Sequence, residues 1–306
     1  MGEQTKIEWC DSTWNPWYCC REVSAGCENC YARAWARRAG KAWGQPIRAA
    51  EKTFHAPQHW AESRKIFVGS LSDFFFDTSY DFHRLQKEAT IVMASACWHR
   101  YLLLTKRPQN IAPALEKHMI ESIWPWRSIW LGVTVENQDA VWRIEELAKV
   151  PAAIRWVSFE PLVGPVEVPD HLWDELDWIV IGGESGPKAR PMDPDWVEDL
   201  MIEADENGKP VFFKQWGEWA PFSGCSVDPF AMNPRSIEGH YCRLYRVGRK
   251  NTLNLWDGQA LHEYPRQCRV CRCTDRMPCN DPIDGPCHWI AADLCSSCAT
   301  EAACES

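Results

Sequence analysis

A chain of 306 residues, 45% of them hydrophobic and 25% charged, is long enough to bury a sizeable core and has the composition of a globular protein. The formal net charge of −9 excludes broad, sequence-independent coating of nucleic acid and leaves room only for a local basic patch. The first residues do not read as a signal peptide, and no apolar run reaches membrane-spanning length. We therefore expect a cytoplasmic protein with no membrane partner, in which many of the 16 cysteines bind metal.

Three cysteines lie close together near the N-terminus, in the pattern Cys-x6-Cys-x2-Cys formed by Cys20, Cys27 and Cys30. A short strand is expected within residues 5–19 before them, and a helix over Tyr31–Ala39 after them. Three thiolates from one loop can hold three irons of a cubane [4Fe–4S] cluster and leave the fourth iron open for another ligand. The spacing therefore predicts a cluster site on a loop between a strand and a helix.

Two other interpretations of the same cysteines stay open at this point. A zinc site needs a fourth protein ligand, which Cys10 or Cys19 can supply. The third interpretation is a group of buried or paired structural cysteines.

Beyond residue 64, apolar runs typical of strands alternate with helical stretches. The predicted strands are Ile66–Ser70, Arg100–Thr105, Ile129–Val135, Ile154–Phe159, Trp178–Gly182 and Pro210–Gln215. The predicted helices are Phe82–Trp98, Asn110–Ile120, Asp139–Lys149 and Pro194–Glu206. Continuous apolar strands separated by helices indicate an α/β fold with a parallel sheet covered on its faces. With the strand before the cysteine loop, we expect seven strands, either in a doubly wound sheet or in a partial (β/α) barrel.

Polar residues follow the predicted strands at the same relative place, strand after strand. The carboxyl ends of parallel strands form the active site in β/α barrels and in open α/β sheets. The cysteine loop follows the first strand, so it is expected on the same rim. The ionisable residues expected to face one cavity there are Asp73, Lys106, Glu136, Glu160, Glu184 and Lys214. The alternative is a structural ladder of ion pairs and loop caps.

A series of motifs in fixed order resembles a known family. They are Thr5–Trp9, Thr13–Pro16, Cys30–Ala32, Ser70–Phe74, Leu104–Pro108, Leu131–Gln138, Ser158–Leu162, Ile181–Gly186, Ala189–Met192, Phe213–Gly217, Asp257–Gly258 and Glu263–Pro265. Together with the cysteine triad they resemble the radical S-adenosylmethionine (SAM) superfamily, and more closely a phage-associated, radical-SAM-like family of unknown function. The resemblance covers about residues 5–265.

The resemblance implies a radical-SAM-like partial barrel over residues 1–265, with a [4Fe–4S] cluster on the triad and SAM as a small-molecule partner. It implies reductive cleavage of SAM to modify an unknown substrate, with a nucleotide or nucleic acid as the leading expectation, and an electron donor such as flavodoxin or ferredoxin. The alternative is a non-catalytic metal-binding protein used in protein or nucleic-acid interaction. Were the gene carried by a phage, the protein would work in the host cytoplasm.

This chain departs from the superfamily pattern in two places. Its first cysteine gap is six residues where the superfamily usually has three, which still lets the three ligands converge because loop length adds little closure cost. The superfamily's Gly-Gly-Glu at the second strand stands here on a late strand, so the end of the second strand is preferred for the methionine group of SAM. The candidate cofactor-binding residues are Ser72, Asp73, Glu136, Gly182 and Gly183. The candidate catalytic residues are Lys106, Glu160, Glu184 and Lys214.

The composition changes sharply at Gln267, and residues 266–306 are expected to form a small Cys-rich module. Its cysteines are Cys268, Cys271, Cys273, Cys279, Cys287, Cys295 and Cys298, with Cys304 near the end. Two C-x2-C pairs around a turn-rich segment indicate a zinc-ribbon-like site. The predicted Zn²⁺ ligands are Cys268, Cys271, Cys295 and Cys298. A second metal on Cys273, Cys279, Cys287 and His288, or a second Fe–S cluster, is the alternative, and so small a module needs metal to fold.

Overall fold

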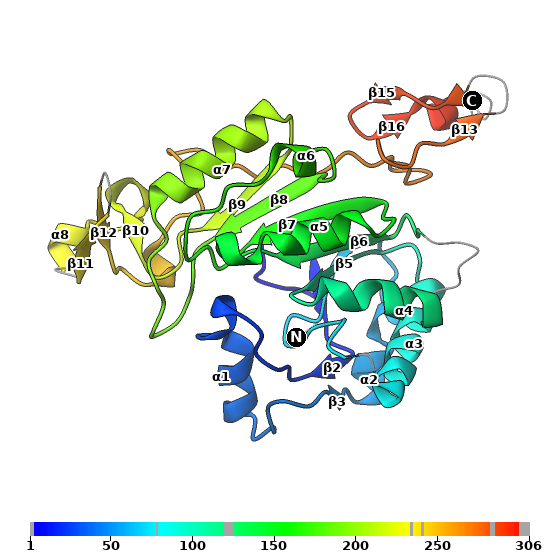
Figure 1. Cartoon of the computed structure of the whole chain (residues 1–306), viewed down its shortest axis with the longest axis horizontal. Coiled ribbons are helices and arrows are strands. Elements are labelled where there is room, and N and C mark those ends of the chain that lie inside the picture. Colours follow the sequence, from blue (N-terminus) through cyan, green and yellow to red (C-terminus); the bar gives the residue numbers. More distant parts are fainter. Residues whose placement is uncertain are drawn as a thin grey trace.

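The computed structural model describes residues 3–77, 79–118, 125–232, 235–239, 242–281 and 285–299. Its centre is a parallel sheet of seven strands in the order β1-β4-β5-β6-β7-β8-β9 (Figure 1). The strands are β1 (Ser12–Trp14), β4 (Lys65–Val68), β5 (Arg100–Thr105), β6 (Ile129–Thr134), β7 (Ile154–Phe159), β8 (Trp178–Gly182) and β9 (Val211–Gln215). They follow one another in chain order without a reversal, so the sheet has no topological switch point and curls into a half-barrel. This confirms the α/β fold with a partial barrel and excludes the doubly wound alternative.

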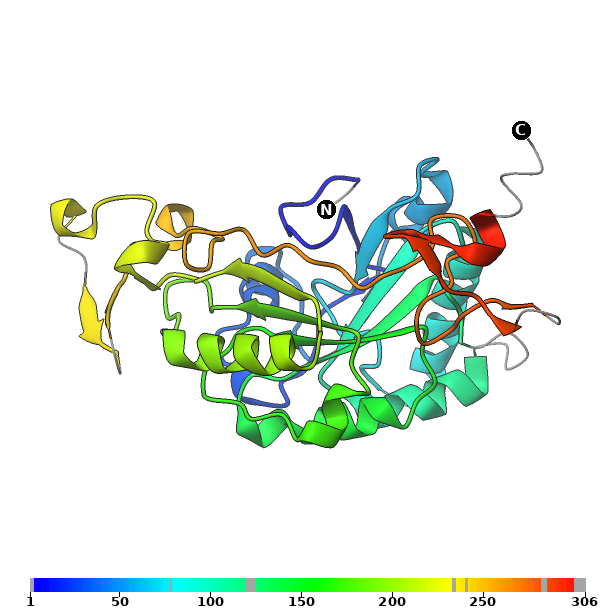
Figure 2. The same cartoon turned by 90° about the horizontal axis from the view of Figure 1, so that it is seen from above.

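The helices between β4 and β9 cover the convex face of the sheet, while the N-terminal residues and the segment after β9 lie on the other side (Figure 2). The helices are α1 (Tyr31–Arg38), α2 (Glu51–Phe54), α3 (Tyr80–Ser95), α4 (Ile111–His118), α5 (Trp142–Ala148), α6 (Asp170–Trp173), α7 (Pro194–Glu206) and α8 (Pro229–Met232). The predicted end of the fourth helix at Ile120 lies outside the described residues. α7 begins as the sequence predicts, because Asp193 caps it by accepting from the backbone N–H of Asp195 and Pro194 stands at its first position.

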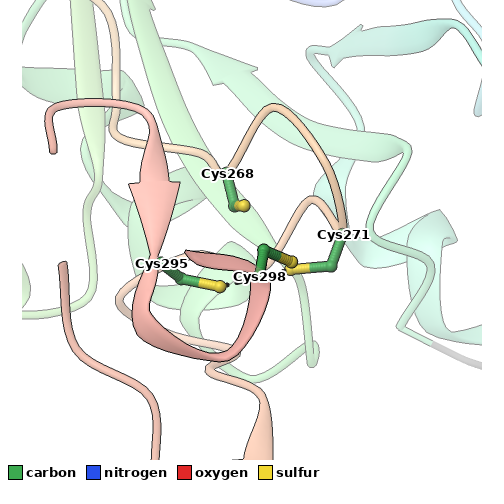
Figure 3. Close-up of side chains that lie close together, drawn as sticks. All are labelled: Cys268, Cys271, Cys295 and Cys298. Carbon is green, nitrogen blue, oxygen red and sulfur yellow. Dashed lines mark hydrogen bonds between the residues drawn. The ribbon is translucent and has the colours of Figure 1, made fainter. Parts of the chain in front are cut away.

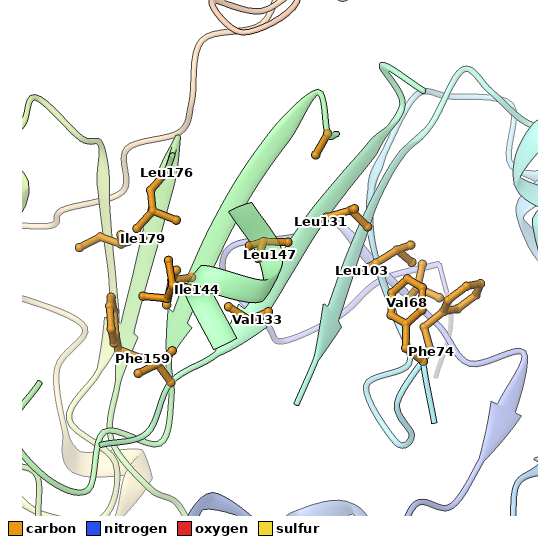
Figure 4. Close-up of a cluster of buried hydrophobic side chains, with 14 of the residues drawn as sticks. Val68, Phe74, Leu103, Leu131, Val133, Ile144, Leu147, Phe159, Leu176 and Ile179 are labelled. Atoms are coloured by element: carbon orange, nitrogen blue, oxygen red, sulfur yellow. The ribbon is translucent and has the colours of Figure 1, made fainter. Parts of the chain in front are cut away.

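The side chains of the strands alternate between two buried layers. Leu131 and Val133 of β6 pack with Ile144 and Leu147 of α5 in the layer between sheet and helices (Figure 4). Trp130, the residue before Leu131, points to the concave side, where it joins a second cluster. That cluster contains Trp9, Cys10, Phe67, Leu102, Trp130, Ile154, Trp156, Trp178, Val180 and Phe212. The half-barrel is therefore filled on its inside by large aromatic rings.

Gly132 makes room for this aromatic filling. A Cβ atom at Gly132 would lie 2.4 Å from Cε2 of the Trp156 ring. The rings of Trp9 and Trp156 lie 5.2 Å apart and those of Trp156 and Trp178 5.3 Å apart, centroid to centroid. These separations are those of favourable aromatic pairs, and four of the 19 tryptophans form this one layer inside the half-barrel.

A small antiparallel sheet follows β9, formed by β10 (Ala220–Pro221), β12 (Arg243–Tyr245) and β11 (Ser236–Glu238). Another short pair, β2 (Trp17–Tyr18) with β3 (Ile47–Arg48), flanks the cysteine loop. The sequence did not predict these pairs, because strands of two or three residues carry no periodicity.

The segment around Leu261 runs antiparallel along β9. The N–H of Phe213 donates to the carbonyl of Leu261 (2.8 Å), and the N–H of Glu263 donates to that of Val211 (3.1 Å). The open edge of the sheet is thereby covered.

The cysteine-rich tail contains β13 (Asn280–Asp281), β14 (Gly285–Pro286), β15 (Trp289–Ala291) and β16 (Leu294–Cys295). It packs against the amino ends of the central strands. Arg272 donates to the carbonyls of Trp98 and His99 just before β5, and the Thr274 hydroxyl donates to the carbonyl of Ala153 just before β7 (2.9 Å). The tail and α1 consequently lie at opposite ends of the sheet (Figure 1). Within the described part of the chain, no helix combines the length and the apolarity needed to cross a bilayer.

Candidate functional site

A cavity of about 250 Å³ lies at the carboxyl ends of the parallel strands. The cysteine loop lines it with Cys20, Cys27 and Cys30, and the aromatic layer lines it with Trp9 and Phe67. The predicted site residues that also line it are Ser72, Asp73, Lys106, Glu160, Gly183, Glu184 and Lys214. The structure thus brings together residues that are separated by almost 200 positions, on the rim where parallel strands are expected to converge.

Asp73 connects the cysteine loop to β5. Its buried carboxylate accepts from the Thr105 hydroxyl (2.7 Å), from the backbone N–H of Lys106 (3.2 Å) and from Nη1 of Arg107 (2.9 Å). Nη1 of Arg107 lies 3.6 Å from Sγ of Cys20, and Nη2 donates to the carbonyl of Arg21. Asp73, a candidate for binding SAM on the family resemblance, therefore already holds the arginine that contacts the first cysteine.

Glu136 connects the middle of the same loop to β6. Its fully buried carboxylate accepts from the backbone N–H of Gly26 (3.1 Å) and from Nη1 of Arg143 (2.7 Å), and Nζ of Lys106 lies 3.9 Å away. Burial opposes ionisation of Glu136, but the charges of Lys106 and Arg143 outweigh it and hold its pKa below the ordinary range. Glu136 is therefore an ionised anchor for the loop.

Glu184 connects the end of the loop to β8. Its carboxylate accepts from Nδ2 of Asn29 (3.0 Å) and from the backbone N–H (2.8 Å) and Nη2 (2.6 Å) of Arg190. Arg190 also donates to the carbonyl of Ala25 (3.0 Å). Burial works against the charged form, yet these donors lower the pKa of Glu184 below its ordinary value. Three strand-end carboxylates thus fix the cysteine loop at three points.

Four predicted residues line the cavity and do not anchor the cysteine loop through a carboxylate: Ser72, Lys106, Glu160 and Lys214. Nζ of Lys214 pairs with Glu160 across the ends of β9 and β7. The Ser72 hydroxyl is buried and has no hydrogen-bond partner among the described residues. A buried hydroxyl of this kind is suited to a ligand that supplies the missing partner.

The two glycines of Gly182-Gly183 have a packing role. A Cβ at Gly183 would lie 2.0 Å from the carbonyl oxygen of Trp216, and a Cβ at Gly182 would lie 3.3 Å from the side chain of Glu160. The close approach of the ends of β8 and β9 is by itself enough to require glycine at position 183. Gly182 is absent from the lining of the cavity.

Cys20 is half-buried at the edge of the cavity. Burial and the neighbouring charge of Asp73 raise its pKa to about 12, against the opposing effect of Arg107. A metal that binds here must therefore displace a proton from Cys20, and binding is expected to release it.

The second cysteine group lies in the tail (Figure 3). The sulfur atoms of Cys268, Cys271, Cys295 and Cys298 all lie within 4.8 Å of one another. These four thiols can hold a metal ion, and they are the set that the C-x2-C spacing predicts. Cys304 lies outside the described residues.

The arginines that hold the anchoring carboxylates were missed as site residues by the sequence reasoning. Arg107 directly follows Lys106 in a motif that was noted, and Arg190 lies in another, so both signals were present. The sequence contains no signal for Arg143, because a single arginine on a helix such as α5 is usually a surface charge. Only the fold places Arg143 beside Glu136.

Fold and site together define a mixed α/β half-barrel protein with a cysteine-rich group at each end of its sheet. Residues 4–265 match the family described as "Protein of unknown function (DUF5131)", and the chain belongs to this family. The tail with its cysteine group lies beyond the matched residues. Searches of curated proteins and of solved structures returned no match.

Proposed function

We propose that the protein is an iron–sulfur enzyme of the radical SAM type, with Cys20, Cys27 and Cys30 as the cluster ligands. The observation that carries the proposal is that all three thiols line the cavity at the carboxyl ends of the half-barrel. Three thiols from one loop are the donor set that a [4Fe–4S] cluster takes when one iron is left for another ligand. They do not form a compact group of the kind found in the tail, as a single zinc ion would require.

When bound, such a cluster supplies the electron for reductive cleavage of the sulfonium bond of SAM. The electron would come from a donor such as flavodoxin or ferredoxin. The chain's own contribution is to hold the ligands in place: Arg107 donates toward Cys20, Glu136 fixes the N–H of Gly26, and Glu184 fixes Asn29. Trp9 and Phe67 in the lining of the cavity would help to keep water from the reacting groups.

The polar side chains of the cavity that do not anchor the cysteine loop suggest where SAM and substrate bind. The unpaired hydroxyl of Ser72 is available to a polar group of SAM. Lys106 and the Lys214–Glu160 pair line the same cavity. Two lysines at the rim suit an anionic substrate such as a nucleotide or a segment of nucleic acid, which supports that substrate class.

The test is anaerobic reconstitution with iron and sulfide, followed by incubation with SAM and a chemical reductant. We expect about four irons per chain at the triad and formation of 5′-deoxyadenosine. The variant Cys20→Ala/Cys27→Ala/Cys30→Ala should lose both, whereas Cys97→Ala, which removes an exposed cysteine outside both groups, should lose neither. A full cluster in the triple variant would overturn the ligand assignment.

A non-catalytic metal-binding protein is the second candidate, and one observation favours it. Asp73, Glu136 and Glu184 are all satisfied by internal donors, so the cavity offers fewer free carboxylates than the sequence suggests. A protein that loads the cluster at the triad but forms no 5′-deoxyadenosine with any reductant would support this candidate.

A further inference from the structure

The tail contains more thiols than one metal ion can use. Beside the set of Cys268, Cys271, Cys295 and Cys298, a second compact set is formed by Cys271, Cys273, Cys279 and Cys295. In each set all sulfur atoms lie within 4.8 Å of one another. Both sets contain Cys271 and Cys295, so the two groups are joined and are not two separate sites.

The sulfur separations match those around tetrahedral metal ions. A Zn–S bond of about 2.3 Å places two thiolates of one tetrahedral ion about 3.8 Å apart. Sγ of Cys271 lies 3.6 Å from Sγ of Cys295 and 3.3 Å from Sγ of Cys279. In a cubane Fe–S cluster each cysteine binds a different iron, which requires a more open group.

Two tetrahedral ions need eight ligand positions. Six thiolates fill them only if two of the six bind both ions. The two cysteines that belong to both sets are the ones placed to do so, and the other four then bind one ion each.

We infer that the tail holds a binuclear thiolate centre of two divalent zinc-class ions, bridged by Cys271 and Cys295. Cys268 and Cys298 complete one ion, and Cys273 and Cys279 complete the other. This inference does not depend on the proposed SAM chemistry, because the tail lies at the opposite end of the sheet.

The charge of the surroundings fits such a centre. Two divalent cations with six thiolates leave a net negative charge, which a buried site must balance. Arg127, in the loop before β6, approaches the second set: its Nη1 lies 3.7 Å from Sγ of Cys279 and 3.2 Å from the carbonyl oxygen of Cys271. Arg127 thereby joins the centre to the half-barrel and offsets one of its negative charges.

Cys287 provides a matched control inside the tail. Its Sγ lies 3.6 Å from that of Cys273 and accepts from the backbone N–H of Cys279 (3.1 Å), but it belongs to neither compact set. The binuclear arrangement predicts that Cys287 is dispensable for metal binding.

The test counts zinc in the full-length chain by elemental mass spectrometry, in a Cys20→Ala/Cys27→Ala/Cys30→Ala background that removes the N-terminal triad. We expect two zinc ions per chain. Cys273→Ala/Cys279→Ala should retain one, and Cys287→Ala should retain two. A count of one in the parent chain, an iron-loaded tail, or loss of zinc in Cys287→Ala would overturn the assignment.

A second measurement avoids substitution of the tail. After replacement of zinc by ¹¹³Cd, the bridged centre predicts two cadmium resonances that couple to each other through the shared sulfurs. Two resonances without mutual coupling would contradict the bridge, and a single resonance would contradict the second ion.

Discussion

Glu136 gives the sharpest test of how the cysteine loop is held. Its side chain is fully buried between the N–H of Gly26 and the guanidinium of Arg143, which is itself only 3% exposed. The substitution Glu136→Gln keeps the shape and an acceptor oxygen but removes the negative charge, so Arg143 becomes a buried cation without its counterion. Breaking a buried ion pair from one side costs about 3–5 kcal/mol, and the retained acceptor places this variant near the lower end.

The assay is urea unfolding of the metal-free protein, followed by measurement of iron retention in the reconstituted protein. We expect Glu136→Gln to lower the unfolding free energy by about 3 kcal/mol and to speed iron loss, since the central anchor of the loop loses its charge. The control is Glu145→Gln, an exposed glutamate on the same helix as Arg143, which should change stability by no more than about 0.5 kcal/mol. Equal effects of the two substitutions would refute the anchoring role of Glu136.

Three further predictions follow from the same contacts. Trp156→Ala should lower the unfolding free energy measured in urea by about 3–5 kcal/mol, because it leaves a cavity at the centre of the aromatic layer. The control is Trp142→Ala on the surface, which should change the unfolding free energy by about 0.5 kcal/mol. The pKa values of Glu136 and Glu184 in the folded protein lie below their ordinary value of 4.5. The stability that these two carboxylates contribute is therefore fully present above pH 4.5 and is lost as the pH falls through the lowered pKa. Unfolding of metal-free protein in a pH series measures this, and loss of the contribution above pH 4.5 would contradict it. A chain ending at Pro265 should still bind iron at the triad, since the described residues of the tail contact the half-barrel at the amino ends of its strands. Failure of that chain to fold would show that residues 266–306 belong to the core.

The strands and their carboxyl-end residues could be predicted because a buried parallel strand is a continuous apolar run. β5 occupies the predicted residues, and β9 begins one residue later than predicted. The convergence of Asp73 and Glu184 on one cavity follows from parallel strands alone. The grouping of Cys268, Cys271, Cys295 and Cys298 could be predicted because C-x2-C spacing holds the two thiols of each pair close together.

The roles of the carboxylates could not be predicted. Whether Asp73 or Glu184 faces a ligand or an internal cation depends on where Arg107 and Arg190 point, and no spacing in the sequence encodes that direction. The shared use of Cys271 by two sets is also invisible in the sequence, because it arises from folding of the turn between the two cysteine pairs. The division of the chain at residue 265 stays a prediction.

The central claim is that Cys20, Cys27 and Cys30 hold a cluster with one iron open to SAM. The measurement that tests it most directly is the EPR spectrum of the reduced, reconstituted protein before and after addition of SAM. The account predicts the signal of a reduced [4Fe–4S] cluster, a change in that signal when SAM is added, and no signal in the Cys20→Ala/Cys27→Ala/Cys30→Ala variant. An unchanged signal in the presence of saturating SAM, or the same signal from the triple variant, would contradict it.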